Sequence, residues 1–277
     1  MSGLALVLSG GGMFGAYQAG VWAELSRLGQ PSIVVGASVG ALNGWAIAGG
    51  MPGEQLAEEW LDPARQTPPR FRWPASLYDG ILDSAALESW IAQLHAAWTP
   101  KLRLGITLTR LWDFQQELVE PPAITWQHLA ASCGVPLFLR QYRLNGHRYA
   151  DGGLVTALPV WAALKMGATS LITVNVLAGG RDDLAAAGAR LLRWVTRFRP
   201  PTPACPVVSL DPPQPLGAPR EMMTWNRDRI RRWIEEGRAA VHRNKHLLCD
   251  MFFSNASIPC SPDEGRVPPA IPLGRPH

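Results

Sequence analysis

Long apolar runs and early positive charges are both missing from this 277-residue chain. No stretch reaches the ~18 apolar residues that a membrane span needs. No Lys or Arg precedes Arg27, so the apolar N-terminal residues lack the charged region that begins a signal peptide. We therefore expect a cytoplasmic protein whose contact with a membrane, where it occurs, is peripheral.

Charge of either sign is also scarce. Charged residues make up 17% of the chain, and the formal net charge is +4. This excess is too small to indicate a nucleic-acid partner, although it is compatible with an anionic lipid surface. We expect no nucleic-acid binding.

Cysteine and histidine are few and carry no metal-ligand spacing. Four cysteines are scattered without a C-x-x-C pair, which favours free thiols in a reducing compartment, with a disulfide as the alternative: Cys133, Cys205, Cys249 and Cys260. None of the six histidines has a recognisable partner. His242 and His246 lie one turn apart in a basic segment, where solvated side chains are the expected state. The sequence therefore predicts neither a metal site nor a histidine base.

The first fifty residues contain two successive strand, turn and helix patterns. An apolar run at 4–8 precedes a glycine-rich loop and helical spacing over 16–28. The pattern recurs with a strand at 32–35, a tight turn at 36–40 and a helix over 41–50. Two such units predict a parallel sheet with right-handed crossovers.

The rest of the chain extends this pattern. The dipeptide Asn145-Gly146 between two short polar strands predicts a type I′ hairpin that leads to Asp151. We expect a single catalytic domain over residues 1–250, with a helical insertion or lid at 54–98. A Pro-rich tail follows over 251–277. The other expected elements are strands at 102–111, 170–176 and 206–210, and helices at 126–136, 159–168 and 221–248.

The glycine loop contains Gly10, Gly11, Gly12 and Gly15 in a G-x-G-x-x-G pattern between a strand and a helix. Backbone N–H groups and the helix dipole favour an anion there. A dinucleotide site also needs an acidic residue about 20 positions further on, where this chain has Val and Gly only, at 34–36. A glycine turn without a ligand stays an alternative.

The second motif is G-x-S-x-G, formed by Gly36, Ser38 and Gly40. A nucleophile elbow needs these glycines because the serine takes strained backbone angles and leaves no space for neighbouring side chains. A chain of this composition contains such a pattern by chance about one time in eight. The position of the motif between a strand and a helix favours its interpretation as a catalytic elbow.

A serine nucleophile needs a base, and an Asp is the remaining candidate. Asp151 precedes Gly152 and Gly153 at the end of a predicted strand. Taken alone, Asp-Gly is one of the commonest turn pairs and carries no chemistry.

The three motifs, in this order, closely resemble the patatin-like phospholipase family. The matching stretches are "SGGGMFGAYQAGVWAEL", "VVGASVGALNG", "AASCGVPLFLR" leading into "YADGGLVTALPV", and "MGATSLITVNV". The resemblance covers residues 4–176 well and the segment 225–240 more loosely. It implies a three-layer α/β/α fold with a mostly parallel sheet. It also implies that the protein hydrolyses acyl esters and needs no cofactor.

Residue by residue, the resemblance implies that Ser38 is the nucleophile, that Asp151 is its base, and that the amides of Gly10, Gly11 and Gly12 form an oxyanion hole. Phe14 stands where family members often have Arg or Lys, which removes a positive side chain from the loop but leaves its backbone donors. An ordinary aspartate is a weak base, so we expect a desolvated Asp151 with a raised pKa.

Two questions stay open at this level. A non-catalytic anion- or nucleotide-binding protein is the alternative from another class, and an acyltransferase or thioesterase would use the same dyad. The segment 189–199 places Arg190, Arg193 and Arg197 on one helical face, which suits a helix on an anionic membrane or one packed on the sheet.

Overall fold

A five-stranded parallel sheet forms the centre of the protein in this computed structural model, which describes residues 3–63, 70–178 and 198–253. The strands lie in the order β3-β2-β1-β7-β8, all parallel. Residues of β1 and β2 are buried along their whole length, as expected for apolar runs covered on both faces. The bounds are β1 Leu4–Leu8, β2 Ile33–Ala37, β3 Arg103–Arg110, β7 Ser170–Val174 and β8 Val207–Ser209.

An antiparallel extension continues the sheet beyond β3. Strands β4 (Gln116–Val119) and β6 (His147–Ala150) both pair with β3, and β5 (Tyr142–Leu144) pairs with β6. The turn between β5 and β6 has φ of 49° at Asn145 and 84° at Gly146, which confirms the predicted hairpin.

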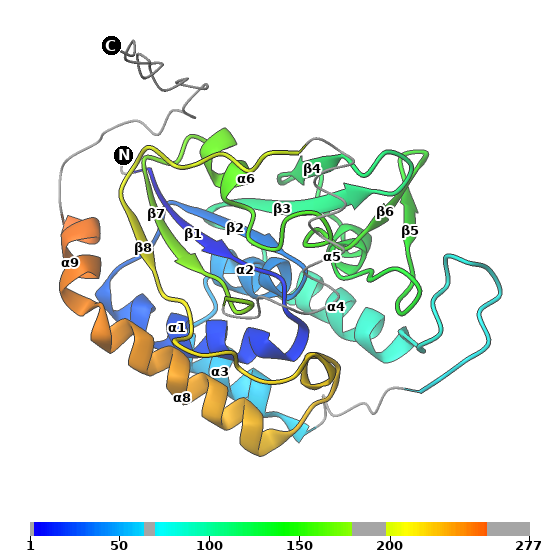
Figure 1. The fold of residues 1–277 in the computed structure, drawn as a ribbon, viewed down its shortest axis with the longest axis horizontal. Helices are drawn as coiled ribbons and strands as arrows, with labels where there is room; N and C mark the ends of the chain where they lie inside the picture. The colour runs from blue at the N-terminus through cyan, green and yellow to red at the C-terminus, as the bar shows by residue number, and fades with distance from the viewer. Residues whose placement is uncertain (1–2, 64–69, 179–197, 254–277) are drawn as a thin grey trace, which may run out of the picture.

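Helices cover both faces of the sheet, which confirms the three-layer prediction (Figure 1). Leu4, Leu6 and Leu8 of β1 pack with the layer of α1 (Gly15–Leu28), α2 (Val39–Gly49) and α8 (Arg227–Arg243). The alternate residues Ala5 and Val7 pack against α6 (Val160–Lys165) on the other face. The period of two along the strand thus divides one apolar run between two cores.

The predicted insertion at 54–98 contains two helices that belong to the body of the domain. Leu56 and Ala57 of α3 (Gly53–Leu61) and Ile91 and Leu94 of α4 (Ala85–Ala97) are buried in the main core. Helix α4 packs on α5 (Trp126–Ser132). The connecting residues 70–83 project away from the body in Figure 1.

The prediction of one helix over 221–248 is wrong. A 3-10 turn, η3 (Pro219–Met223), is followed by α8 and then by α9 (Lys245–Phe253). The Asn226 side chain accepts the N–H of Arg229 and begins α8, and Asn244 separates the two helices, with its side chain donating to the carbonyl of Ala240. The first residues of the predicted tail, 251–253, are helical.

Two segments named in the sequence analysis are not covered by the structure. Residues 254–277 and most of the amphipathic segment 189–199 lie outside the described residues.

The cysteines differ from one another. Cys133 and Cys249 are free thiols, but Cys205 is disulfide-bonded, so the expectation of free thiols is wrong there. Among the described helices, none combines the length and apolar character that a membrane crossing requires.

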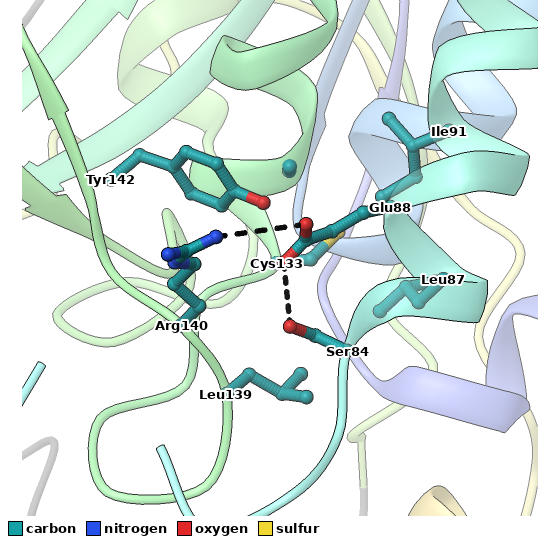
Figure 2. A pocket seen from close by; sticks show the side chains of 9 residues that line it. Ser84, Leu87, Glu88, Ile91, Cys133, Leu139, Arg140 and Tyr142 are labelled. Carbon is teal, nitrogen blue, oxygen red and sulfur yellow. Dashed lines mark hydrogen bonds and ion pairs between the residues drawn. The ribbon is translucent and has the colours of Figure 1, made fainter. Parts of the chain in front are cut away.

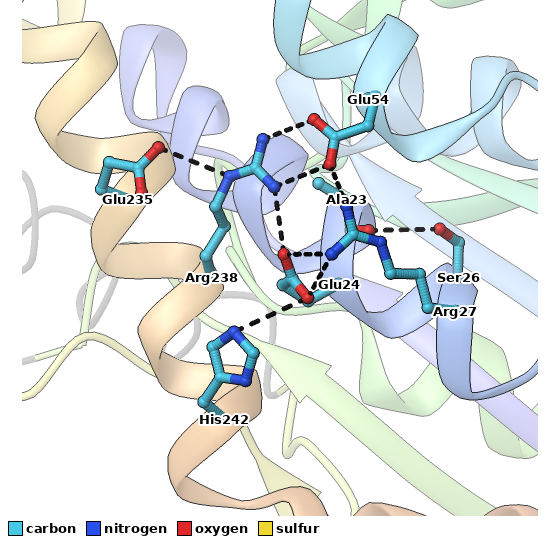
Figure 3. A network of polar contacts seen from close by, with 8 residues as sticks. All are labelled: Ala23, Glu24, Ser26, Arg27, Glu54, Glu235, Arg238 and His242. Carbon is cyan, nitrogen blue, oxygen red and sulfur yellow. Dashed lines mark hydrogen bonds and ion pairs between the residues drawn. The ribbon is translucent and has the colours of Figure 1, made fainter.

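An ion-pair network fastens α8 to α1 and α3 (Figure 3). Arg238 of α8 contacts Glu54 of α3 at 2.6 Å and Glu24 of α1 at 3.1 Å. Arg27 contacts both glutamates from the opposite side. The Arg238 hydrogen bond lowers the pKa of the Glu54 carboxyl. Because Glu24 is nearly buried, it needs these cations to offset its desolvation.

We expect Arg238→Ala to lower the free energy of unfolding by about 2 kcal/mol, because it leaves Glu24 with fewer partners, while the exposure of Glu54 limits the loss. Urea denaturation measures this. Arg231→Ala is the matched control, since Arg231 and its partner Asp228 are both exposed, and it should cost less than ~0.5 kcal/mol. Equal losses in the two variants would contradict the role of the network.

Candidate active site

Ser38 occupies a sharp turn between β2 and α2. Its backbone has φ of 54° and ψ of −128°, a strained conformation for a residue with a side chain, and only 8% of the residue is exposed. A Cβ at Gly36 would lie 2.1 Å from the carbonyl oxygen of Gly40, and one at Gly40 would lie 2.5 Å from that of Leu8. The turn therefore requires both glycines of the motif, as expected for a nucleophile elbow.

Asp151 follows β6 and lies beside this elbow. Burial raises the pKa of its carboxyl from 3.8 to about 6, against hydrogen bonds from the Ser38 side chain and the Gly153 N–H, which lower it. The Gly153 N–H donates to Oδ1 at 2.6 Å. The expectation of a desolvated aspartate with a raised pKa is confirmed, and the carboxylate is close enough to the Ser38 side chain to be affected by it.

The turn after Asp151 packs directly on β3. A Cβ at Gly152 would lie 2.0 Å from the carbonyl oxygen of Thr107, so only glycine fits there. The Thr109 hydroxyl donates to the Asp151 carbonyl at 2.8 Å. Strand β3 therefore fixes the backbone on which the carboxylate is carried.

The glycine loop lies against Ser38. A Cβ at Gly10 would be 3.2 Å from the Cβ of Ser38, and the φ angles of Gly11 and Gly12 are 153° and 54°. The N–H of Gly10 donates to the carbonyl of Ala157 at 3.0 Å, so this amide is already engaged. Within the described part of the chain, the amides of Gly11 and Gly12 have no acceptor. They are the available donors of the loop.

Phe14 points into the core and away from the site. It is 4% exposed and meets the ring of Trp233 edge-on, with ring centroids 5.0 Å apart. Gly15, next to it, lies against Val39 of α2, where a Cβ would be 2.4 Å from Cγ2. The position at which the family often has a cation is thus an apolar anchor between the loop and α8.

Ser132, the last residue of α5, is a positioning residue that sequence reasoning missed. Its Oγ accepts the backbone N–H of Ser38 at 2.9 Å and donates to the carbonyl of Thr107 at 2.9 Å. Its own carbonyl accepts the N–H of Gly152 at 3.1 Å. One buried residue thus connects the elbow to the turn that carries Asp151. The only sequence signal is its place in the stretch "AASCGVP", because a serine 94 positions away has no local pattern.

A small pocket lies between α4 and the segment that follows α5 (Figure 2). Cys133 lies in its wall, and burial raises the pKa of the Cys133 thiol. Ser84 donates to Glu88 at 2.6 Å, and Arg140 lies 3.9 Å from the same carboxylate. The apolar wall is formed by Leu87, Ile91, Ala130 and Leu139.

No three His, Cys, Asp or Glu side chains gather as metal ligands within the residues that the structure describes. The groups that the described residues bring together at the site are a hydroxyl, a carboxylate with a raised pKa, and backbone amides.

A family model described as patatin-like phospholipase matches residues 6–164, which span the elbow, the glycine loop and Asp151. The chain belongs to this family. The match covers more than half of the 277 residues.

Individual relatives are distant. The patatin-like phospholipase domain-containing protein 7 of Rattus norvegicus is 26% identical, over 69% of this chain and 15% of its own length. The uncharacterized protein YjjU of Escherichia coli is 28% identical, over 69% of this chain and 57% of its own length. The structure of VipD from Legionella pneumophila aligns at a TM-score of 0.48 with 12% identity, over 90% of this chain and 67% of that one.

We expect Ser132→Ala to destabilise the domain by about 1–3 kcal/mol, since it leaves the Ser38 N–H and the Thr107 carbonyl buried without their partner. Chemical denaturation measures the loss. Ser89→Ala, at an exposed position of α4, is the control and should stay within ~0.5 kcal/mol of the wild type. A Ser132 variant as stable as the Ser89 variant would show that this bridge contributes nothing.

Proposed function

We propose that this protein is a serine hydrolase that cleaves carboxylic acyl esters of lipids. The observation that supports this most directly is the burial of Asp151 beside the elbow that carries Ser38, which raises the pKa of the Asp151 carboxyl to about 6. A carboxylate of that basicity is suited to accept a proton near neutral pH. Membership of the patatin-like phospholipase family supports a lipid ester as substrate.

In the first half of the reaction, Oγ of Ser38 attacks the ester carbonyl while Asp151 takes the hydroxyl proton. The carbonyl oxygen becomes an oxyanion, and the amides of Gly11 and Gly12 are the donors that we assign to it. Each such donor contributes ~3–4 kcal/mol in comparable sites, because it is oriented before the charge develops. The protonated Asp151 then passes its proton to the departing alcohol, which leaves an acyl-enzyme.

In the second half, Asp151 removes a proton from water, which attacks the acyl-enzyme and releases the fatty acid. Transfer to another acceptor would start from the same acyl-enzyme, so the product distinguishes hydrolase from acyltransferase.

Nucleotide binding is the weaker alternative. A phosphate site at the loop would draw on several backbone donors, yet the Gly10 amide is engaged with Ala157. The carbonyl oxygen of Met222 in η3 lies against Gly12, 2.3 Å from where its Cβ would be. The η3 backbone therefore closes one side of the loop, which leaves less space for a bulky phosphate than for an ester carbonyl oxygen.

We expect a fluorophosphonate probe to label the wild type and to leave Ser38→Ala unlabelled, because the probe forms its bond with an activated serine. Asp151→Asn should label at least about 100-fold more slowly, since the amide cannot accept the proton. Ser89→Ala should label like the wild type. Labelling of Ser38→Ala at the wild-type rate would exclude the proposed nucleophile. Mass spectrometry of the labelled peptide is the readout.

The labelling rate should rise about tenfold per pH unit at low pH and level off above about 6, because only ionised Asp151 acts as base. Circular dichroism over the same pH range checks that the loss at low pH is titration and not unfolding. A midpoint near pH 4 would instead indicate a solvated carboxylate, and would contradict the burial that raises this pKa.

A further inference from the structure

Exposed large apolar side chains gather on two segments, 70–83 and 137–141, at one end of the molecule. Trp73 is 98% exposed, Leu77 83%, Phe71 78% and Leu137 66%. Single exposed apolar residues are normal on protein surfaces, but a cluster that contains a fully exposed tryptophan indicates an interaction site. We call this cluster the apolar tip; its members are Phe71, Trp73, Leu77, Tyr78, Ile81, Leu137 and Phe138.

Backbone hydrogen bonds hold the two segments of the apolar tip together. Ile81 N–H donates to the carbonyl of Leu137 at 2.9 Å, and Leu82 N–H donates to that of Phe138 at 3.0 Å. Leu137 has a φ of 71°, a costly conformation for leucine. Leu137 thus combines a strained backbone with an exposed apolar side chain, a combination that is typical of functional positions.

Arginines surround the apolar tip. Arg70, Arg72 and Arg143 are exposed, and the guanidinium of Arg148 stacks over the Tyr78 ring at 3.9 Å. Residues 70–83 and 137–148 contain five arginines against two aspartates, Asp79 and Asp83. This apolar centre with a basic rim complements the acyl chains and phosphates of an anionic lipid surface.

The apolar tip is also connected to the dyad. The carbonyl of Gly134 accepts the N–H of Asp151 at 3.0 Å, and Leu137 follows three residues later. Leu139, directly after the apolar tip, and Cys133 line the same small pocket. A lipid held at the apolar tip therefore lies against the same segment, 134–139, that holds the Asp151 backbone.

We propose that the apolar tip docks this enzyme onto anionic lipid bilayers, with the aromatic and leucine side chains at the level of the acyl chains and the arginines on the headgroup phosphates. The relevance of this surface to catalysis rests on the proposed function, because a lipid substrate is what makes docking useful. Docking itself does not depend on the dyad.

The test measures binding to phosphatidylcholine vesicles with and without 30% phosphatidylglycerol, by co-sedimentation, in a Ser38→Ala background that leaves the lipid intact. Replacing Trp73, Leu77 and Leu137 together by Ser should weaken binding at least about tenfold. Phe253→Ser is the matched control, since Phe253 is 74% exposed on α9 at the opposite end of the molecule, and it should bind as the parent does (Figure 1). Arg70→Gln with Arg143→Gln should abolish the preference for the anionic vesicles.

The proposal would be overturned if the parent protein did not bind anionic vesicles, or if the triple variant bound them equally well. It would also be overturned if the parent were a dimer and the triple substitution produced a monomer with unchanged vesicle binding, because the apolar tip would then be a dimer interface. Hydrolysis of soluble p-nitrophenyl butyrate by the chain with Ser38 intact separates the two hypotheses. Triple-variant activity equal to wild type, together with weak vesicle binding, supports docking. A wild type that binds vesicles but hydrolyses no ester contradicts the proposed function and leaves docking standing.

Discussion

A carboxylate that is buried beside Ser38 sets the conditions that the surrounding structure has to meet. The carboxylate of Asp151 accepts the N–H of Gly153, and burial raises its pKa to about 6. With a guanidinium partner it would be a weaker base. Strand β3 supports this arrangement through two buried residues. The Thr107 carbonyl accepts the Ser132 hydroxyl, and the Thr109 hydroxyl donates to the Asp151 carbonyl.

Close backbone approach is the second constraint, and it explains why the motifs consist of glycine. At Gly36, Gly40 and Gly152 an added Cβ would overlap a carbonyl oxygen of a neighbouring segment. These contacts bring β1, β2, β3 and the N-terminus of α2 close enough for one hydroxyl and one carboxylate to meet. Larger residues would separate the segments, and proton transfer between Ser38 and Asp151 would need a fit of tenths of an ångström.

Features with a local cause could be predicted from the sequence, whereas those that depend on distant segments could not. The Asn145-Gly146 hairpin follows from the backbone angles that its own residues permit, and the elbow at Ser38 was predicted from its motif between a strand and a helix. The pairing of Ser38 with Asp151 came from family resemblance, since the spacing alone does not specify it. Ser132 was missed because its two partners lie 94 and 25 residues away. The break at Asn244 was missed because basic helical spacing continues on both sides of it.

Phe14 shows how the family's loop is held when its cation is absent. The ring of Phe14 packs on Trp233 of α8, and α8 in turn is fastened to α1 and α3 through Arg238. The glycine loop is thus positioned by packing, which fixes the amides without adding a positive side chain to the loop. In our proposal, contacts to lipid phosphate shift to the arginines around the apolar tip. Recognition of the headgroup and stabilisation of the transition state are then carried out by separate parts of the molecule.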